Sequence, residues 1–185
     1  MGKDIKGFTD PEANSSLNGD IEYLGADAVL GNYPPTNVAL TVGVGSAQDT
    51  TLRTQLFCEL KSEEFDFPPI VHPNAFVASK VSINSGVQIM AGAVIQPGTT
   101  VSENVIVNTN ASIDHDCEIG AHTHIAPGAT LSGEVSTGER VHVGTGASII
   151  QGVDIGNRSV VGAGAVVTED VPSDSLVVGV PAVQK

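Results

Sequence analysis

The sequence predicts a solenoid of short stacked strands, because one six-residue pattern runs without a gap through more than half of the chain. Residues 71–172 divide into seventeen consecutive hexads in a single register. Sixteen of the seventeen first positions hold Val, Ile or Leu, and Thr137 is the exception. All fifth positions hold small or β-branched residues. Together these positions define the interior of the predicted solenoid.

Each hexad reads as a short extended segment followed by a turn. Positions five and one lie two residues apart across the boundary between hexads, so their side chains point to the same face of a strand. The fourth position is Gly, Asn or Asp in twelve of the seventeen hexads, and these residues tolerate the positive φ of a sharp corner. No single hexad can bury its inner face alone. The units must therefore stack on one another.

This pattern resembles the left-handed parallel β-helix of the hexapeptide-repeat acyltransferases, in which three hexads form one triangular coil of eighteen residues. The resemblance implies that residues eighteen apart stack at about 4.8 Å along the axis. Position six then points outward from a flat face, and position three lies at a corner. The expected fold is a left-handed parallel β-helix over residues 67–172.

Residues 1–66 follow a different pattern. The segments Asp4–Asp10 and Asn37–Gly45 read as short strands, and Ser46–Glu64 reads as a helix whose first residue is the N-cap. A strand, a turn with glycine and a helix form the start of an α/β unit. We therefore expect a small, incomplete α/β (Rossmann-like) domain before the β-helix. After it, residues 173–185 carry no hexad register and are expected to close the solenoid.

The composition excludes some partners. The formal net charge of −13 argues against binding to nucleic acid or to an anionic membrane surface. A small anionic ligand stays compatible, because a local basic cluster acts within a Debye length of about 8 Å. Cys117 occupies an inward fifth position, which predicts a reduced core thiol. The chain shows no apolar signal region and no membrane-length apolar run, so we expect a cytoplasmic protein without membrane insertion.

The spacing of the histidines predicts a site between subunits. His115 is at a third position, and His124 is at a sixth position nine residues later, which is half a coil. On one triangular prism the two side chains face different sides, so they meet only across an interface between two copies. His142 lies eighteen residues after His124 and stacks on it. His72 and His122 read as ordinary surface residues.

A narrower resemblance covers essentially the whole chain and is strongest in the segment NTNASIDHDCEIGAHTHIAPGATLSGEV, Asn108 to Val135. This segment is similar to the signature region of the sialic acid O-acetyltransferase and bacillosamine-type nucleotide-sugar N-acetyltransferase family. The resemblance implies transfer of an acetyl group from acetyl-CoA to an amino or hydroxyl group of a sugar or nucleotide sugar in surface-glycan biosynthesis. It also implies direct attack in a ternary complex and a homotrimer with sites between subunits.

The resemblance implies a role for each matching residue. His115 is the general base, Asp116 orients it, and the backbone N–H of Gly133 occupies the position that stabilises the oxyanion. The implied acetyl-CoA contacts are His124, Thr145 and Ala163. An imidazole with a pKa of about 6.5 suits removal of the acceptor proton at neutral pH.

A row of cationic side chains is expected at one corner. His122, Arg140 and Arg158 occupy fourth positions at intervals of eighteen residues, where Gly or Asn is the easier choice. Such a row would hold the CoA phosphates, with Arg158 as the expected contact. The alternative, a solvated edge with scattered charge, stays open.

The acceptor side is less complete than in the family. Gly43 and Gly45 would let backbone amides approach a phosphate at a helix N-terminus, although a tight turn without a ligand is the alternative. Family members begin with a strand, a Gly-rich loop of the G-x-G-G-H kind and a helix, whereas this chain starts at what corresponds to the second strand. Asp10 and Gly43 match nucleotide-side positions, and most of the acceptor pocket has no counterpart.

Other functions are also considered. The β-helix carbonic anhydrases hold Zn²⁺ with three imidazoles, but the other ligand positions of that class carry no histidine here. Counted from His115 and from His124, those positions hold Gly120 and Ser79, and Ile119 and Gln88. We therefore expect no metal. A non-catalytic solenoid subunit that binds acetyl-CoA without turnover stays as the alternative, and a metal-dependent hydratase ranks below it.

Overall fold

The computed structural model describes residues 4–12, 21–46 and 49–185. It divides into two compact units, residues 1–39 and residues 40–185. The boundary expected at residue 66 falls inside the second unit, because the chain from residue 40 onward already packs on the solenoid; the side-chain amide of Gln88, for example, donates to the carbonyl of Val42 at 2.9 Å.

The first unit contains a small parallel sheet. β1 (Phe8–Thr9) pairs with β2 (Tyr23–Gly25), and the 3₁₀ helix η2 (Asp27–Asn32) follows. The ring centroids of Phe8 and Tyr23 lie 5.5 Å apart, and this aromatic contact stabilises the pairing of the two strands. The first expected strand is confirmed by β1, whereas β2 and η2 were not predicted.

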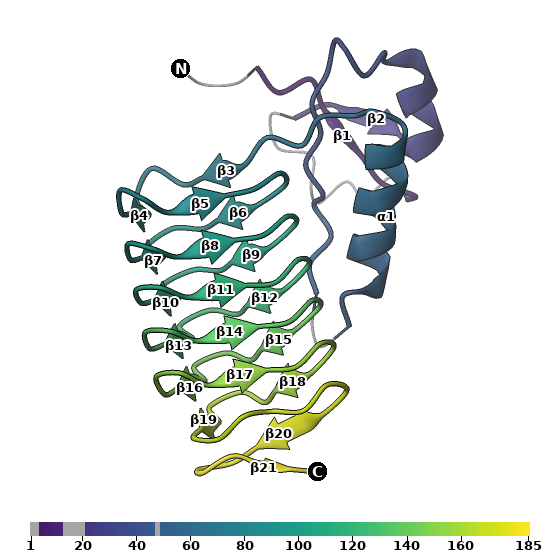
Figure 1. The fold of residues 1–185 in the computed structure, drawn as a ribbon. Helices are drawn as coiled ribbons and strands as arrows, with labels where there is room; N and C mark the ends of the chain where they lie inside the picture. The colour runs from purple at the N-terminus through teal and green to yellow at the C-terminus, as the bar shows by residue number, and fades with distance from the viewer. Residues whose placement is uncertain (1–3, 13–20, 47–48) are drawn as a thin grey trace. The chain divides into compact units, whose positions relative to one another are not determined.

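The second unit is dominated by a left-handed parallel β-helix with three flat faces, named here after one strand of each (Figure 1). The β10 face consists of β4 (Phe76–Val77), β7 (Val94–Ile95), β10 (Ser112–Ile113), β13 (Thr130–Leu131), β16 (Ser148–Ile149) and β19 (Val166–Val167). The β11 face consists of β5 (Ser82–Ile83), β8 (Thr100–Val101), β11 (Glu118–Ile119), β14 (Ser136–Thr137) and β17 (Asp154–Ile155). The β12 face consists of β3 (Ile70–Val71), β6 (Gln88–Ile89), β9 (Ile106–Val107), β12 (His124–Ile125), β15 (His142–Val143), β18 (Val160–Val161), β20 (Leu176–Val178) and β21 (Val183–Gln184).

The register follows the eighteen-residue spacing that the hexads predict. Ser112 pairs with Thr130 on the β10 face, and His124 pairs with His142 on the β12 face. Every sixth residue from Lys80 to Gly164 has a positive φ, so the fourth position is the corner of each turn. Three rows of turns result, which we call the β10–β11, β11–β12 and β12–β13 corners.

The interior is the ladder of first and fifth positions. Ile95, Ile113, Leu131 and Ile149 stack at most 1% exposed along one face, and each buried aliphatic side chain of this size contributes about 1.5–3 kcal/mol. Cys117 is fully buried, as its fifth position predicts.

The last hexad is not regular, and the expectation of seventeen uninterrupted hexads is wrong there. Ile155 bridges to Val171 and Val160 pairs with Leu176, both sixteen residues apart rather than eighteen. The coil is shortened because the carboxylate of Asp170 accepts the backbone N–H of Asp154 at 2.9 Å, where other coils use a backbone carbonyl. The β-helix then continues through β20, and β21 closes it by antiparallel pairing.

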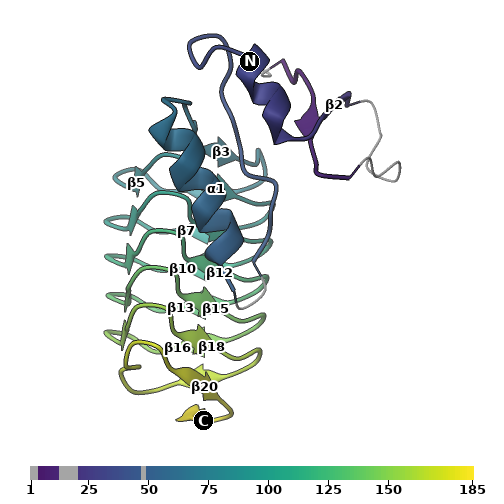
Figure 2. The same cartoon turned by 90° about the vertical axis from the view of Figure 1, so that its right-hand side faces the viewer.

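The helix α1 (Thr51–Ser62) lies along the β11–β12 corner, beside the β12 face (Figure 2). Phe57 anchors it: its ring is fully buried and lies 4.7 Å from that of Phe67 and 5.8 Å from that of His122 between centroids. Gly86 makes room for this ring, because a Cβ there would lie 2.5 Å from Phe57. Packing on the solenoid therefore stabilises this helix. The side chain of Thr50 does not cap it, but the carboxylate of Asp49 accepts the backbone N–H of Thr51 at 2.8 Å.

Two expectations for this segment are wrong. The strand expected over Asn37–Gly45 is reduced to a single bridge at Ala39, where the backbone N–H of Leu40 donates to the carbonyl of Asp66 at 2.8 Å. The residues after it run over the β12 face and bond to a side chain of that face. Ser46 is not the N-cap, since α1 begins at Thr51 and Ser46 bonds instead to His124. Within the described residues, no helix has the length and apolar character needed to cross a bilayer.

Candidate active site

The turn Asp114–Cys117 connects β10 to β11 and carries an imidazole–carboxylate pair. His115 Nδ1 lies 2.9 Å from Asp116 Oδ2, and both side chains are about half exposed, at 48% and 64%. Asp114 Oδ1 accepts the backbone N–H of His115 at 2.8 Å. Asp116 has φ 57°, which swings its carboxylate back beside the imidazole of the preceding residue.

Two glycines enclose this pair from the neighbouring coils. A Cβ on Gly98 would lie 2.1 Å from Asp116 Oδ1, and a Cβ on Gly133 would lie 2.6 Å from His115 Cε1 and 2.7 Å from Nε2. Glycine at both positions thus lets the two side chains lie against the backbone of the coils above and below. Sequence reasoning identified Gly133 but missed Gly98, although Gly98 is eighteen residues before Asp116.

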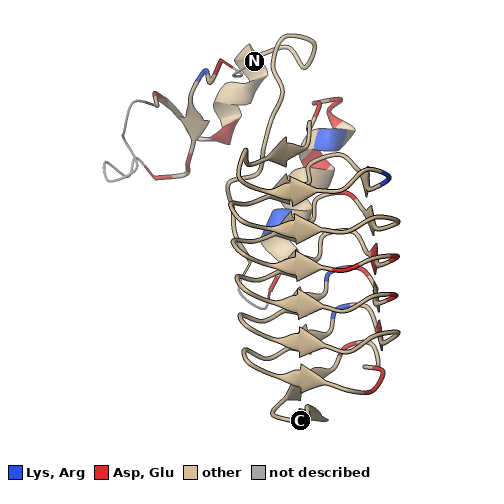
Figure 3. Ribbon diagram, turned by 90° about the vertical axis from the view of Figure 1, so that its left-hand side faces the viewer, with Lys and Arg blue, Asp and Glu red and all other residues tan. Residues whose placement is uncertain are grey.

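The charges at this corner favour the protonated imidazole. The hydrogen bond that the imidazole donates to the carboxylate of Asp116 raises the pKa of His115 above its ordinary value, and the charges of Asp114 and Glu134 add to this effect. Figure 3 shows acidic segments gathered along one edge of the β-helix while most of the ribbon is uncharged. The hydrogen-bond network assigns the Nδ1–H to Asp116, so the lone pair of Nε2 faces away from the carboxylate.

His124 lies on the β12 face and is covered by the chain itself. His124 is 7% exposed. Its Nδ1 lies 2.6 Å from the carbonyl oxygen and 2.9 Å from the hydroxyl of Ser46. Its Nε2 lies 3.0 Å from the amide nitrogen of Asn108. The carbonyl requires a donor at Nδ1, so Nε2 accepts from Asn108. Burial lowers the pKa of His124, and the charge of Arg53 acts in the same direction.

His142 packs edge-on against His124, with ring centroids 5.2 Å apart. Burial, and then the neighbouring His124, lower its pKa to about 4. Among the described residues its buried Nδ1 finds no hydrogen-bond partner. The sequence predicts both rings outward on a flat face, and their position on the β12 face confirms this. It did not predict that residues 40–62 would cover them.

The remaining expected acetyl-CoA residues lie on other parts of the prism. Thr145 and Ala163 are exposed at the β12–β13 corner, stacked eighteen residues apart. His115 is at the β10–β11 corner, and His124 is on the β12 face. The spacing argument that His115 and His124 face different sides of one chain is therefore confirmed.

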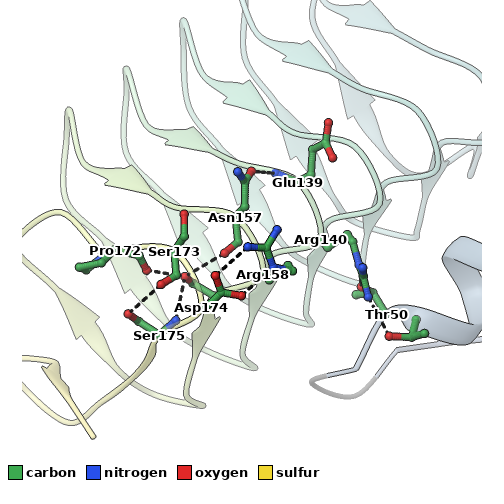
Figure 4. Close-up of polar contacts among 11 residues, drawn as sticks. Thr50, Glu139, Arg140, Asn157, Arg158, Pro172, Ser173, Asp174 and Ser175 are labelled. Atoms are coloured by element: carbon green, nitrogen blue, oxygen red, sulfur yellow. Dashed lines mark hydrogen bonds and ion pairs between the residues drawn. The ribbon is translucent and has the colours of Figure 1, made fainter.

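The row of cations at the β11–β12 corner is engaged within the chain (Figure 4). Arg158 makes a bidentate ion pair with Asp174, at 2.6 and 2.7 Å. Arg140 donates to the hydroxyl of Thr51 at 2.7 Å. His122 is only 8% exposed and bonds to the side chain of Asn104, so the expectation of a surface histidine is wrong. Packing of α1 over this corner is the reason.

The two expected acceptor residues belong to different units. The carboxylate of Asp10 accepts the backbone N–H of Glu12 at 2.8 Å, just after β1. Gly43 is exposed on the irregular segment before α1, eight residues before the helix begins, rather than in a turn at the helix N-terminus. In residues 4–12, 21–46 and 49–185, no three His, Cys, Asp or Glu side chains converge as metal ligands.

Comparison with known proteins identifies the family. The family model described as bacterial transferase hexapeptide (six repeats) matches residues 98–133. The acetyltransferase domain of PglB from Neisseria gonorrhoeae FA1090 is 37% identical, with 97% of this chain and 86% of that chain covered and a TM-score of 0.91. The chain belongs to the hexapeptide-repeat acetyltransferase family. This confirms the resemblance read from the hexads and from Asn108–Val135.

Ligand complexes of related hexapeptide-repeat acetyltransferases are also known. The PglB domain in complex with acetyl coenzyme A is 36% identical, with 97% and 85% coverage and a TM-score of 0.90. PerB from Caulobacter crescentus, solved with CoA and GDP-perosamine, is 37% identical, with 89% and 79% coverage and a TM-score of 0.84. The matched repeat segment begins at Gly98 and ends at Gly133, the two glycines that enclose His115 and Asp116.

Proposed function

We propose that this protein transfers the acetyl group of acetyl-CoA to an amino group of a nucleotide sugar. The observation that carries the proposal is the His115–Asp116 pair, 2.9 Å apart and enclosed between Gly98 and Gly133 at an exposed corner. The complexes of the PglB domain with acetyl coenzyme A and of PerB with CoA and GDP-perosamine support both substrates.

The chemistry follows from the orientation of the imidazole. Nε2 of His115 accepts a proton from the acceptor nitrogen as that nitrogen attacks the thioester carbonyl. The oxyanion formed is stabilised by the backbone N–H of Gly133. Among the described residues, this N–H donates to no backbone acceptor. Collapse of the tetrahedral intermediate breaks the carbon–sulfur bond. The CoA thiolate then takes the proton from the His115 imidazolium, and no covalent enzyme intermediate is needed.

The charge of the corner favours an amine over a hydroxyl. Asp114, Asp116 and Glu134 surround His115 with negative charge, which attracts an amino sugar in its ammonium form. The ammonium group releases one proton to solvent before it attacks, and His115 takes the second proton as the carbon–nitrogen bond forms. An amine is also the stronger nucleophile once it loses its proton. A hydroxyl acceptor carries no charge for these carboxylates to attract.

The site is completed by a second subunit in this proposal. His124, Thr145 and Ala163 lie on sides of the prism other than that of His115, so a trimer would present them from the neighbouring chain. For His124 to reach the thioester, one of its hydrogen bonds to Ser46 or Asn108 must be exchanged for one to the ligand. On the acceptor side, Asp10 in the first unit is a proposed contact to the nucleotide. Gly43 is a second proposed contact, predicted from the sequence.

The function is tested by measuring CoA thiol release with a panel of nucleotide-linked amino sugars and their hydroxyl counterparts. We expect turnover with an amino sugar. His115→Ala should lower kcat by roughly 10²- to 10⁴-fold while acetyl-CoA affinity stays nearly unchanged. His72→Ala, in the first coil, is the matched control and should keep full activity.

Two outcomes would contradict the proposal. Full kcat in the His115→Ala variant would show that His115 is not the general base. Binding of acetyl-CoA by calorimetry without thiol release on any acceptor would favour a non-catalytic solenoid subunit instead.

A further inference from the structure

We propose that the buried hydroxyl of Thr99 is a positioning residue that holds the His115 turn from inside the β-helix. This inference rests on the proposed function, since it assigns Thr99 a part in the reaction of His115. Thr99 makes no side-chain hydrogen bond to the described atoms of His115 or Asp116 and acts through the backbone on either side of them.

The contacts of Thr99 span the turn. Thr99 is fully buried at a fifth position, directly beneath the turn in the preceding coil. Its Oγ1 donates to the carbonyl of Asp114 at 2.8 Å and accepts the N–H of Cys117 at 3.2 Å. These are the first and last residues of the turn, so one side chain ties both of its ends.

A second contact continues upward. The thiol of Cys117 donates to the carbonyl of Ser132 at 3.2 Å, and Ser132 precedes Gly133. The buried polar side chains Thr99 and Cys117 therefore link the coil below His115 to the turns of His115 and of Gly133.

The fold does not require such contacts at this corner. The fifth positions along the β10–β11 corner are Val81, Thr99, Cys117, Val135, Val153 and Val171, so polar side chains occur only in the coil of the His115 turn and in the coil beneath it. The turns above Val81 and Val135 have the same left-handed corner, at Gly98 and Gly152, without a hydroxyl beneath them. The coil closes over valine at these two turns, so closure alone does not require the hydroxyl of Thr99.

The exposed pair depends on this support. The side chains of His115 and Asp116 are about half exposed, so little packing fixes their direction. Their orientation therefore depends on the backbone at Asp114 and Cys117. Thr99 holds this backbone through its two hydrogen bonds. Displacing a catalytic group by about 1 Å reduces the rate by about 10²-fold.

The chain supplies a matched control. Thr123 makes the same two contacts at the β11–β12 corner: its Oγ1 donates to Gly138 at 3.1 Å and accepts from Val141 at 3.1 Å. Thr99→Val and Thr123→Val each remove one hydroxyl and leave one carbonyl and one N–H unpaired in the interior. Both variants should lower the urea midpoint by similar amounts, because the lost contacts are the same.

The experiment compares these two variants with Thr99→Ser. We expect Thr99→Val to lower kcat about tenfold or more with an unchanged KM for acetyl-CoA, and Thr123→Val to keep kcat within about twofold. In an NMR titration of the His115 imidazole, Thr99→Val should lower the pKa toward the ordinary value as the contact with Asp116 loosens. Thr99→Ser keeps the hydroxyl, so both kcat and the pKa of His115 should stay near their wild-type values.

Equal kcat values for Thr99→Val and Thr123→Val would overturn the inference, and so would a loss in kcat that Thr99→Ser fails to restore. If His115→Ala keeps full kcat, the proposed function fails rather than this inference. In that case the NMR titration decides alone, and an unchanged pKa of His115 in Thr99→Val would overturn the positioning role.

Discussion

The imidazole of His115 is half exposed, so its basicity is set by the carboxylates around it rather than by burial. Asp116 is the largest influence and raises the pKa of His115. A general base works in its neutral form, so activity is present above this raised pKa and is lost as the pH falls through it.

Asp116→Asn should therefore move the acid limb of kcat/KM to lower pH, because the pKa of His115 falls when the carboxylate is removed. The plateau of kcat should also drop, by roughly tenfold or more, because the amide fixes the tautomer less firmly. A pH–rate profile measures both effects. Glu118→Gln, on the adjacent β11 strand, serves as the control with an unchanged limb, and an unshifted limb in Asp116→Asn would speak against the pairing.

Gly133 limits what can lie beside the base. A methyl group there would lie 2.6 Å from His115 Cε1, and Gly133 has no positive φ that would strain an alanine. Gly133→Ala should thus push the imidazole aside and lower kcat by about 10²-fold while the thermal midpoint changes little. Gly31→Ala, where a methyl group meets nothing within 4 Å, is the control. Wild-type kcat in Gly133→Ala would mean that the imidazole does not work from this position.

At the scale of elements, α1 and the segment before it cover three histidines on and beside the β12 face. Burial lowers the pKa of His122, His124 and His142 in the folded protein. The unfolded chain returns these groups to an ordinary pKa of about 6.5 and so binds more protons below neutral pH. The free energy of unfolding should therefore fall as the pH falls from 7 toward the folded pKa of His142, which is about 4.

Urea denaturation at pH 7 and pH 5 tests this coupling. His142 alone should account for about 2 kcal/mol of the loss between these two pH values. His142→Gln should make the stability less dependent on pH, whereas His72→Gln, outside the cluster, should leave the dependence as it is. Equal slopes for wild type and His142→Gln would show that α1 leaves this face open to water in solution.

At the scale of the whole molecule, the proposed site needs two chains. His115 belongs to the β10–β11 corner and His124 to the β12 face. If each site takes His115 from one subunit and His124 from its neighbour, His115→Ala and His124→Ala chains are each inactive alone. Mixed and allowed to exchange subunits, they should regain activity at about one quarter of the sites.

This complementation is measured as thiol release after co-refolding, with unmixed variants as controls. Sedimentation should show a trimer in both variants. No recovery in the mixed trimers would contradict a site that takes His115 from one subunit and His124 from its neighbour.

The sequence by itself determined the β-helix and the place on it of His115, the proposed base. A hexad has few ways to bury an Ile at position one and a small residue at position five, so the pattern sets strand, corner and coil length together. Because residues eighteen apart must stack, His115, Asp116 and Gly133 were brought to one corner by counting alone, and the same count would have found Gly98.

Only the tertiary structure decided what covers the β12 face and where the repeat ends. Nothing periodic links Ser46 to His124 or Phe57 to His122, because these contacts join segments with unrelated patterns. The stacked turns at Thr99 and the shortened coil at Val171 likewise depend on single side-chain hydrogen bonds, which hydrophobic periodicity does not record. Repetition fixes a solenoid from within, whereas the chain lying on its surface is placed by individual contacts.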